Sequence, residues 1–519
     1  MFLPEFNQFS ALATAITSVT SVLLLLAVAR QLWAFRWSVT RDRDNKLPLP
    51  NGSMGWPLIG ETFHWLFQGS NFHISRREKY GNVFKTHLLG KPVIRVTGAD
   101  NIRKILLGEH SLVCTQWPQS TRIILGPNTL VNSIGDIHKQ KRKILSKVFS
   151  RTALETYIPR IQDVVRSEIA KWCSAPASVN VFAAAKALTF RIAVRVLLGL
   201  SMEDADVDHL SKIFEELINN LFSLPIDVSF SGLRKGIKAR EKLHAFMEKI
   251  ILEKLQNQRS EGNDAFDYIL SSAKENGHTL TVQELKEAAV ELIFAAHSTT
   301  ASASTSLILQ LLKHPCVVEK ARHELEAYGL RRVSKSGNHS DAEQCLDSTF
   351  NLPYLSLKKL NQLRYLDCIV KEVLRFLPPV SGGYRTALQT FELDGYQIPK
   401  GWSVMYSIRD THETAAAYQS PEVFDPDRFG IGREESKIGR FNYVPFGGGV
   451  RSCVGRELAQ IILKTLAIEL LCTADWRLAT QTFPAMQTVP IVHPVNGLHV
   501  YFDFVNSVKT LPDSQSECI

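Results

Sequence analysis

The pattern of apolar and polar positions predicts two long helices, one at the start of the chain and one near its middle. No charged residue occurs in residues 6–29, and about 20 apolar residues are enough to cross a bilayer as a helix. Residues 282–314 carry the second long apolar pattern; Thr281 and Glu284 form a capping-box signature at its start, and Pro315 follows its end. Because acidic residues occupy its first half, we expect a core helix there and no second membrane span.

Short runs of β-branched and aromatic residues predict strands at Val83–Leu88 and residues 93–96, and residues 395–399 predict a hairpin. The polar residues 329–351 are typical of a surface insertion. The remainder is helical by pattern, so we expect a mainly α fold with small β-sheets.

Basic residues follow the first apolar stretch, whereas Glu5 is the one charged residue before it. This asymmetry places the downstream chain in the cytoplasm. A cleaved signal peptide is the alternative, but it would carry its basic residues before the apolar region. Trp33, Phe35 and Trp37 suit a membrane interface. We therefore expect a lumenal N-terminus (1–5), a transmembrane anchor (6–29), a basic juxtamembrane segment (30–46), a catalytic domain (47–508) and a flexible tail (509–519).

Composition narrows the class of protein. The chain has 519 residues, a net charge of +9 and 45% hydrophobic residues, which allows a large core. Its eight cysteines show no C-x-x-C pair, so the sequence favours reduced thiols over a disulfide framework or a zinc site. Basic residues are not interleaved with aromatic ones in a recognisable module, which argues against nucleic-acid binding.

One cysteine lies between a glycine-rich loop and an apolar helical pattern. The run Phe-x-x-Gly-x-Arg-x-Cys-x-Gly is matched by Phe446, Gly449, Arg451, Cys453 and Gly455. A helix N-terminus offers unpaired N–H groups and partial positive charge, both of which favour a thiolate. A buried free thiol is the plain alternative, and no phosphate-binding glycine pattern fits these positions.

This run resembles the haem-binding loop of cytochrome P-450 monooxygenases. The resemblance implies the cytochrome P-450 fold, with its long central helix, and heme b whose iron takes the thiolate of Cys453 as axial ligand. It also implies cations for the haem propionates. Positions that match the family's cations are Arg451, Arg385 and Arg142, with His138 in place of the commoner tryptophan.

A second feature of the family is a carboxylate and a guanidinium one helical turn apart. Glu372 and Arg375 have that spacing and precede Pro378-Pro379. Arg428, in the downstream Pro-Asp-Arg-Phe run, matches the residue that completes the family's network. Glu319 and Arg322 share the spacing but are more typical of a solvated helix face.

The resemblance places oxygen activation on the long helix, where Thr299 matches the family's threonine. Ala296 stands where the family has glycine and Ser298 where it has an acid. We expect Ser298 to relay protons less effectively than a carboxylate. The alternative is that these hydroxyls only bond back to the helix backbone.

Longer stretches resemble the retinoic-acid hydroxylases, family twenty-six of the cytochromes P-450, and most closely their C-type. They include Phe84-Lys85-Thr86-His87-Leu88-Leu89-Gly90 and Pro378-Pro379-Val380-Ser381-Gly382-Gly383-Tyr384. The resemblance implies 4-hydroxylation of all-trans-retinoic acid, with the 9-cis isomer as a second candidate. By family position the expected substrate contacts are Trp117, Phe222, Phe294, Val380, Ser381 and Val489, with Arg95 and Arg122 as candidates to meet the carboxylate.

No G-x-G-x-x-G motif follows a strand, so the chain is not expected to bind flavin or nicotinamide itself. The resemblance implies molecular oxygen, electrons from NADPH through a separate flavoprotein reductase, membrane lipid as a partner, and the endoplasmic reticulum membrane as location. Two alternatives stay open. One is a haem-thiolate isomerase or dehydratase that needs no reductase, and the other is a non-catalytic retinoid-binding haem protein.

Overall fold

A computed structural model describes residues 3–256, 264–331 and 353–505. The described residues fall into two compact units. One is built from the chain up to Gln116 together with Gly382–Ser407, and the other from Trp117–Ser381 and the chain from Ile408 onward.

The first unit combines a small sheet with four helices. Its helices are α1 (Leu3–Val39), α2 (Thr62–Gln68), α3 (Ser70–Tyr80) and α4 (Ala99–Leu107). Its strands are β1 (Val83–Leu88), β2 (Lys91–Val96), β3 (Val113–Thr115), β5 (Gly382–Ala387), β6 (Phe391–Leu393), β7 (Tyr396–Ile398) and β8 (Ser403–Ser407). Five strands form one sheet in the order β1-β2-β8-β5-β3, in which only the β2–β8 pair is parallel.

Strands β6 and β7 pair as the predicted hairpin. Its two turn residues, Asp394 and Gly395, have φ of 52° and 77°, the left-handed geometry that two-residue hairpin turns require. The strands predicted at Val83–Leu88 and residues 93–96 are present as β1 and β2, which confirms both predictions.

Helix α1 is apolar and exposed. Within Ser10–Val39, the most apolar 18-residue window has a mean hydropathy of 2.2 and none of that window is buried, which is consistent with a membrane anchor. The helix continues past the predicted anchor into the basic segment. There Trp33, expected at the membrane interface, is buried instead: its Nε1 donates to the Met54 carbonyl at 3.1 Å, and its ring meets His87 edge-on. Trp33 therefore packs against other residues of the first unit, where contact with the membrane interface was expected.

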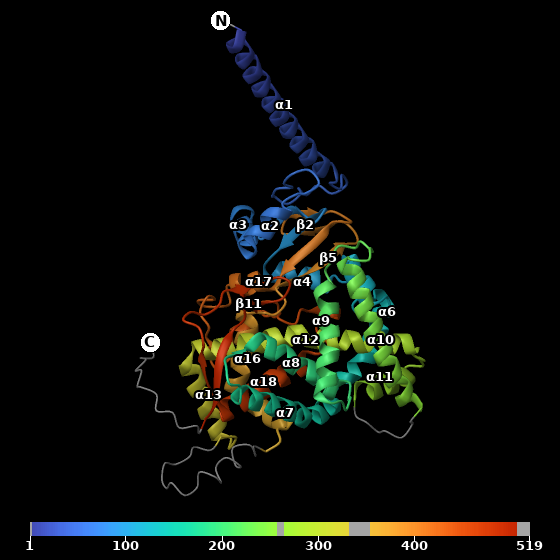
Figure 1. Ribbon diagram of the computed structural model, residues 1–519, viewed down its shortest axis with the longest axis vertical. Coiled ribbons are helices and arrows are strands. Elements are labelled where there is room, and N and C mark those ends of the chain that lie inside the picture. The colour runs from blue at the N-terminus through green and yellow to red at the C-terminus, as the bar shows by residue number, and fades with distance from the viewer. Residues whose placement is uncertain (1–2, 257–263, 332–352, 506–519) are drawn as a thin grey trace. The chain divides into compact units, whose positions relative to one another are not determined.

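The second unit is mainly helical (Figure 1). Its helices are α5 (Gln119–Leu125), α6 (Gly135–Ser146), η1 (Lys147–Phe149), α7 (Arg151–Cys173), α8 (Val181–Arg191), η2 (Ile192–Leu197), α9 (Asp204–Asn220), α10 (Gly232–Gln256), α11 (Ala265–Glu275), α12 (Val282–Lys313), α13 (Pro315–Ala327), α15 (Leu357–Gln362), α16 (Arg364–Phe376), α17 (Ile408–Thr414), η3 (Pro426–Phe429), η4 (Glu435–Lys437), η5 (Gly449–Arg451) and α18 (Arg456–Thr473). Its strands are β4 (Val179–Asn180), β9 (Ala474–Leu478), β10 (Met486–Gln487), β11 (His493–Pro494) and β12 (His499–Phe504), paired as β4-β12-β9 and β10-β11.

Helix α12 organises this unit, packing against α8, α10, α16 and α18 (Figure 1). Thr281 caps it: the Thr281 side chain accepts from the Glu284 N–H and the Glu284 side chain accepts from the Thr281 N–H. Although α12 is apolar enough to span a membrane, 78% of its most apolar window is buried in protein. The prediction of a capped core helix is confirmed.

The cysteines mostly match the expectation of free thiols. Cys114, Cys173, Cys368, Cys453 and Cys472 are free. Cys316 is disulfide-bonded, which corrects the expectation for that residue, because a bond depends on how the fold brings sulfurs together and not on C-x-x-C spacing. Most of the predicted polar insertion and the whole predicted tail lie outside the described residues.

Candidate active site

The loop before α18 presents the sulfur of Cys453. Gly447 and Gly449 have φ of 67° and 65°, a region that residues with a side chain rarely adopt. The chain then folds back, so that the Cys453 N–H donates to the Phe446 carbonyl at 2.9 Å. Gly455 is the N-cap of α18. Among the free cysteines of the described residues, Cys453 alone is exposed.

Two opposing effects act on this thiol. Desolvation by the dense surrounding protein raises the pKa of Cys453, whereas the Gly455 N–H and the guanidinium groups of Arg142 and Arg456 lower it. Desolvation is the larger effect, so the pKa of Cys453 is raised overall, while the N–H group at the helix N-terminus favours the thiolate as expected. A bound metal cation would supply the missing stabilisation, since it displaces the thiol proton. An accessible sulfur ringed by N–H and guanidinium donors fits a thiolate–metal bond.

Two predicted propionate partners lie beside the sulfur. Nη2 of Arg142, on α6, donates to Ser452 Oγ at 3.2 Å. Burial lowers the pKa of Arg142, Cys453 opposes that shift and Arg451 adds to it. The structure therefore brings Arg142, Arg451 and Cys453 together, and His138 is buried one turn before Arg142.

The third predicted cation, Arg385, belongs to the first unit. Its Nε lies 2.8 Å from Glu109 Oε2, and its guanidinium lies 5.3 Å from the centre of the Tyr406 ring. A propionate role for Arg385 stays a prediction.

On α12 the two predicted oxygen-side hydroxyls differ in environment. Thr299 is half-buried and its Oγ1 donates to the Ala295 carbonyl at 2.7 Å, the backbone bond weighed as an alternative above. Ser298 is buried, and its Oγ lies 3.0 Å from Nδ1 of His297. Ser298 thus faces the core with His297, and Thr299 keeps the more accessible side.

His297 was missed by the sequence analysis. It is 1% exposed and packs edge-on against Phe190 and Phe214. Burial, followed by the charge of Lys186, lowers its pKa to about 3, so the imidazole is neutral at physiological pH. A histidine inside an otherwise apolar stretch of α12, next to a departure from the family pattern, was the available signal.

The carboxylate of Glu372 joins both predicted arginines. Arg375 Nε lies 2.7 Å from Glu372 Oε2, and Arg428 Nε lies 3.1 Å from Glu372 Oε1. All three side chains are at most 1% exposed, and Arg428 also pairs with Glu435 at 2.7 Å. The structure brings the three predicted residues together.

His412, which no sequence pattern pointed to, connects this ion cluster to the cysteine loop. Its Nδ1 donates to the Arg375 carbonyl at 3.1 Å, while its Nε2 accepts the N–H of Val444 at 3.0 Å. Burial lowers the pKa of His412 to about 3, which keeps one nitrogen free to accept. Val444 begins the loop that leads to Cys453, so the ion cluster anchors that loop.

The predicted substrate residues form two groups within the second unit. The rings of Trp117 and Phe294 meet edge-on with centroids 6.5 Å apart. The segments around Val380 and Val489 are joined because Ser381 Oγ donates to the Thr488 carbonyl at 3.0 Å.

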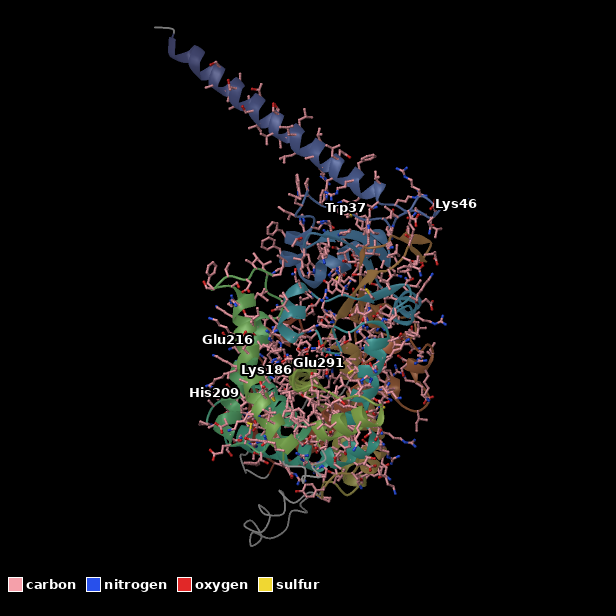
Figure 2. The ribbon with its side chains drawn as sticks, turned by 90° about the vertical axis from the view of Figure 1, so that its right-hand side faces the viewer. Trp37, Lys46, Lys186, His209, Glu216 and Glu291 are labelled. Atoms are coloured by element: carbon pink, nitrogen blue, oxygen red, sulfur yellow. The ribbon has the colours of Figure 1, made fainter. Side chains whose placement is uncertain are left out.

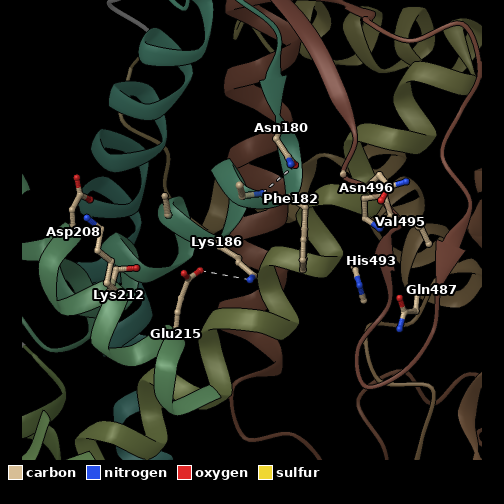
Figure 3. A pocket seen from close by; sticks show the side chains of 15 residues that line it. Asn180, Phe182, Lys186, Asp208, Lys212, Glu215, Gln487, His493, Val495 and Asn496 are labelled. Carbon is tan, nitrogen blue, oxygen red and sulfur yellow. Dashed lines mark hydrogen bonds and ion pairs between the residues drawn. The ribbon is translucent and has the colours of Figure 1, made fainter. Parts of the chain in front are cut away.

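The other predicted contacts are not joined to these groups by any described bond. Phe222 and Arg122 are exposed, and Arg95 is buried in β2 of the first unit. A cavity of about 620 Å³ lies elsewhere, between α8, α9 and the C-terminal strands (Figure 3). Lys186 and Glu215 pair on its wall at 3.6 Å, and Phe182 stacks on His493. None of the predicted substrate residues lines it.

The family model for cytochrome P450 matches residues 50–498. The chain belongs to the cytochrome P450 family. It is 60% identical to human Cytochrome P450 26C1, over 97% of both chains, and 58% identical to bovine Cytochrome P450 26B1, over 98% of this chain and 97% of the relative. Among solved structures it is similar to a retinoic-acid-bound cyanobacterial CYP120A1, with a TM-score of 0.77 and 34% identity, covering 89% of this chain and 100% of that one.

These findings confirm the resemblance, the mainly α fold and the enzyme class. Cytochromes P450 are haem-thiolate monooxygenases that use molecular oxygen and NADPH-derived electrons delivered by a reductase. Cys453, Arg142 and Arg451 have the chemistry that haem needs: one accessible sulfur for iron, and guanidinium groups for anionic propionates.

Replacing Arg428 with alanine should strongly destabilise the fold. It would leave Glu372 and Glu435 with less compensation in the core, at a cost of about 3–5 kcal/mol. Arg433→Ala is the matched control, because Arg433 also pairs with Glu435 but is 38% exposed, and its loss should cost about 0–1 kcal/mol. Chemical denaturation of both variants measures the difference; equal losses would contradict a special role for the buried ion cluster.

His297 should make the fold sensitive to acid. Its pKa is about 3 when folded and about 6.5 when unfolded, so its contribution to stability is present above about pH 6.5 and is lost as the pH falls toward 3. Between these limits, wild type should lose up to about 1.4 kcal/mol per pH unit more than His297→Gln. Denaturation at a series of pH values measures the slope, and His323→Gln, at an exposed histidine, should keep the wild-type slope. An unchanged slope in His297→Gln would refute the assignment.

Proposed function

We propose that the chain is a membrane-anchored monooxygenase that hydroxylates retinoic acid at ring carbon 4, and so clears a retinoid signal. All-trans-retinoic acid is the main substrate and the 9-cis isomer a second. The observation that carries this proposal is the exposed thiol of Cys453 beside Arg142 and Arg451, in a chain 60% identical to a family-26 cytochrome P450. The solved relative with retinoic acid bound supports the substrate class.

Each group of residues has a proposed role. When bound, haem supplies the activation of dioxygen for insertion of one oxygen atom into a C–H bond. Cys453 would supply the sulfur that holds the haem iron, within a loop shaped by Phe446, Gly449 and Gly455. Arg142, Arg451, Arg385 and His138 would neutralise and orient the propionates.

Protons are handled on α12. The half-buried Thr299 hydroxyl would supply the first proton for oxygen activation. Ser298 is the next hydroxyl, and His297 Nδ1 at 3.0 Å fixes its orientation. Because His297 is neutral, its Nδ1 can accept a hydrogen bond from the Ser298 hydroxyl without placing a charge in the core.

The retinoid occupies an apolar space bounded by Trp117, Phe294, Val380 and Val489. The edge-on contact of Trp117 with Phe294 supports a shared wall, and Ser381 holds its own segment to Thr488. Phe222 completes the apolar contacts, and Arg95 or Arg122 meets the carboxylate.

The location follows from α1 and the charges after it. We infer a single-pass protein of the endoplasmic reticulum membrane, with the N-terminal end of α1 toward the lumen and the catalytic domain in the cytoplasm, from residue 47 to residue 508 as the sequence predicts. The exposed apolar surface of α1 supports contact with membrane lipid.

Turnover tests the proposed reaction against its alternatives. Full-length protein with reductase and NADPH should convert retinoic acid to the 4-hydroxy product, and omission of the reductase should abolish product. An isomerase or dehydratase would form product without any electron donor. A sequestering protein would bind retinoic acid and form no product under either condition.

Glycosylation tests the proposed topology. Asn51 is an exposed residue in an Asn-Gly-Ser sequon, so it should carry no glycan if residues 47–508 face the cytoplasm. Expression in eukaryotic cells, followed by glycosidase treatment and gel analysis, measures this. The control is an Asn-x-Thr sequon added before residue 3, which should be glycosylated if the N-terminus is lumenal. Glycan at Asn51 would reverse the topology.

A further inference from the structure

Two carboxylates on α12 hold the backbone of residues 126–133, the segment that leads into α6. Glu291 accepts the N–H groups of Leu130 and Val131, both at 2.8 Å. Glu287 accepts the N–H of Asn128 at 2.7 Å. Both side chains are buried, and Figure 2 shows Glu291 among the side chains of the core.

The segment is shaped to receive these carboxylates. Gly126 has a φ of 98°, and a Cβ at this position would lie 2.5 Å from the carboxyl carbon of Glu287. Gln283 Nε2 donates to Glu287 Oε1 at 2.7 Å, which fixes the carboxylate from the helix side. Burying an acid is costly unless its oxygens are bonded, and here the bonds go to one short segment.

The same segment continues to the cysteine loop. Ser133 Oγ donates to the Thr129 carbonyl at 2.7 Å, and the Ser133 carbonyl accepts from Arg451 Nη2 at 2.5 Å. Helix α6 begins two residues later and carries Arg142, which bonds Ser452. A continuous series of bonds therefore runs from the carboxylates of α12 to the two residues before Cys453.

We propose that Glu287 and Glu291 are positioning residues that hold Arg451 and Arg142 against the cysteine loop by fixing the backbone of residues 126–133. Neither acid has a described contact with the loop itself, so each acts through the segment. The inference rests on the proposed haem-thiolate function, because its consequence is tighter retention of haem.

The acidity of Glu291 is consistent with this arrangement. Burial raises the pKa of Glu291 to about 7, while the N–H groups of Leu130 and Val131 and the charge of Lys141 oppose the shift. Desolvation of the Glu291 carboxylate is costly, and its hydrogen bonds to the segment offset part of that cost.

The test compares Glu291→Gln with Glu248→Gln in the full-length holoprotein. In Glu291→Gln an amide N–H₂ group replaces one carboxylate oxygen. That group cannot accept the backbone N–H that it would face. Glu248 is the control, because it is a carboxylate of α10 that pairs with Lys286 of α12 and has no described bond to residues 126–133. We expect Glu291→Gln to lose haem to a haem-free acceptor protein about tenfold faster than wild type and to exchange the amides of residues 128–131 faster. Glu248→Gln should match wild type in both.

A double-mutant cycle separates positioning from a general loss of stability. If Glu291 acts in part through Arg451, Glu291→Gln should accelerate haem loss less in the Arg451→Gln background than in wild type. Multiplicative effects on the rate would overturn the proposal. If Glu291→Gln does not fold, Gly126→Ala displaces Glu287 from the same segment and is tested in the same way.

The outcomes separate the positioning role of Glu291 from the proposed haem-thiolate function. Wild type that binds haem and a Glu291→Gln variant that retains it equally well would overturn the positioning role alone. Wild type that binds no haem would overturn the proposed function and this inference with it.

Discussion

The buried carboxylate of Glu372 is the constraint on which the rest of the site depends. Two guanidinium groups, those of Arg375 and Arg428, meet it in the core, with Glu435 balancing the second positive charge. Such a cluster tolerates little movement, because any displaced member becomes an unpaired charge in an apolar environment. The backbone around it is fixed as a result, including the Asp425 N–H, which donates to Glu372 at 2.9 Å.

His412 extends that rigidity to the ligand loop. It bonds the Arg375 carbonyl with one nitrogen and the Val444 N–H with the other, which a neutral imidazole can do and a charged one cannot. The loop is held from the opposite end by α18 and from the side by Arg451 and Arg142. Desolvation raises the pKa of the Cys453 thiol, so this preorganisation places the sulfur, and a bound metal ion would complete its ionisation.

Sequence predicted the parts of this protein that rest on local rules. The capping box at Thr281, the hairpin predicted over residues 395–399 and the glycines of the cysteine loop each reflect short-range geometry, so their residue types identified them, although the hairpin turn lies earlier, at Asp394-Gly395. Arg375 and Arg428, the partners of Glu372, were predicted from their positions in the family's sequence pattern. What could not be predicted depends on tertiary packing: Trp33 turns from lipid to protein, and the acids of α12 find N–H groups more than 150 residues away in the chain.

Histidines show the same limit. In sequence His412 looks like any exposed histidine and His297 differs only by its apolar neighbours, so only burial reveals that each is neutral and bonded. The serine at position 298 was expected to relay protons less effectively than a carboxylate, and that role stays a prediction. Its hydroxyl contacts His297 inside the core, a relation that adjacent positions on a helix do not specify.

The most direct test of the account is the absorbance spectrum of the reduced, carbon-monoxide-bound protein, recorded for wild type, Cys453→Ala and Cys472→Ala. Thiolate ligation by Cys453 predicts the red-shifted Soret band of a haem-thiolate protein in wild type and in Cys472→Ala, whose thiol is buried, and its loss in Cys453→Ala. Persistence of that band in Cys453→Ala would show that another residue ligates the iron and would contradict the central claim.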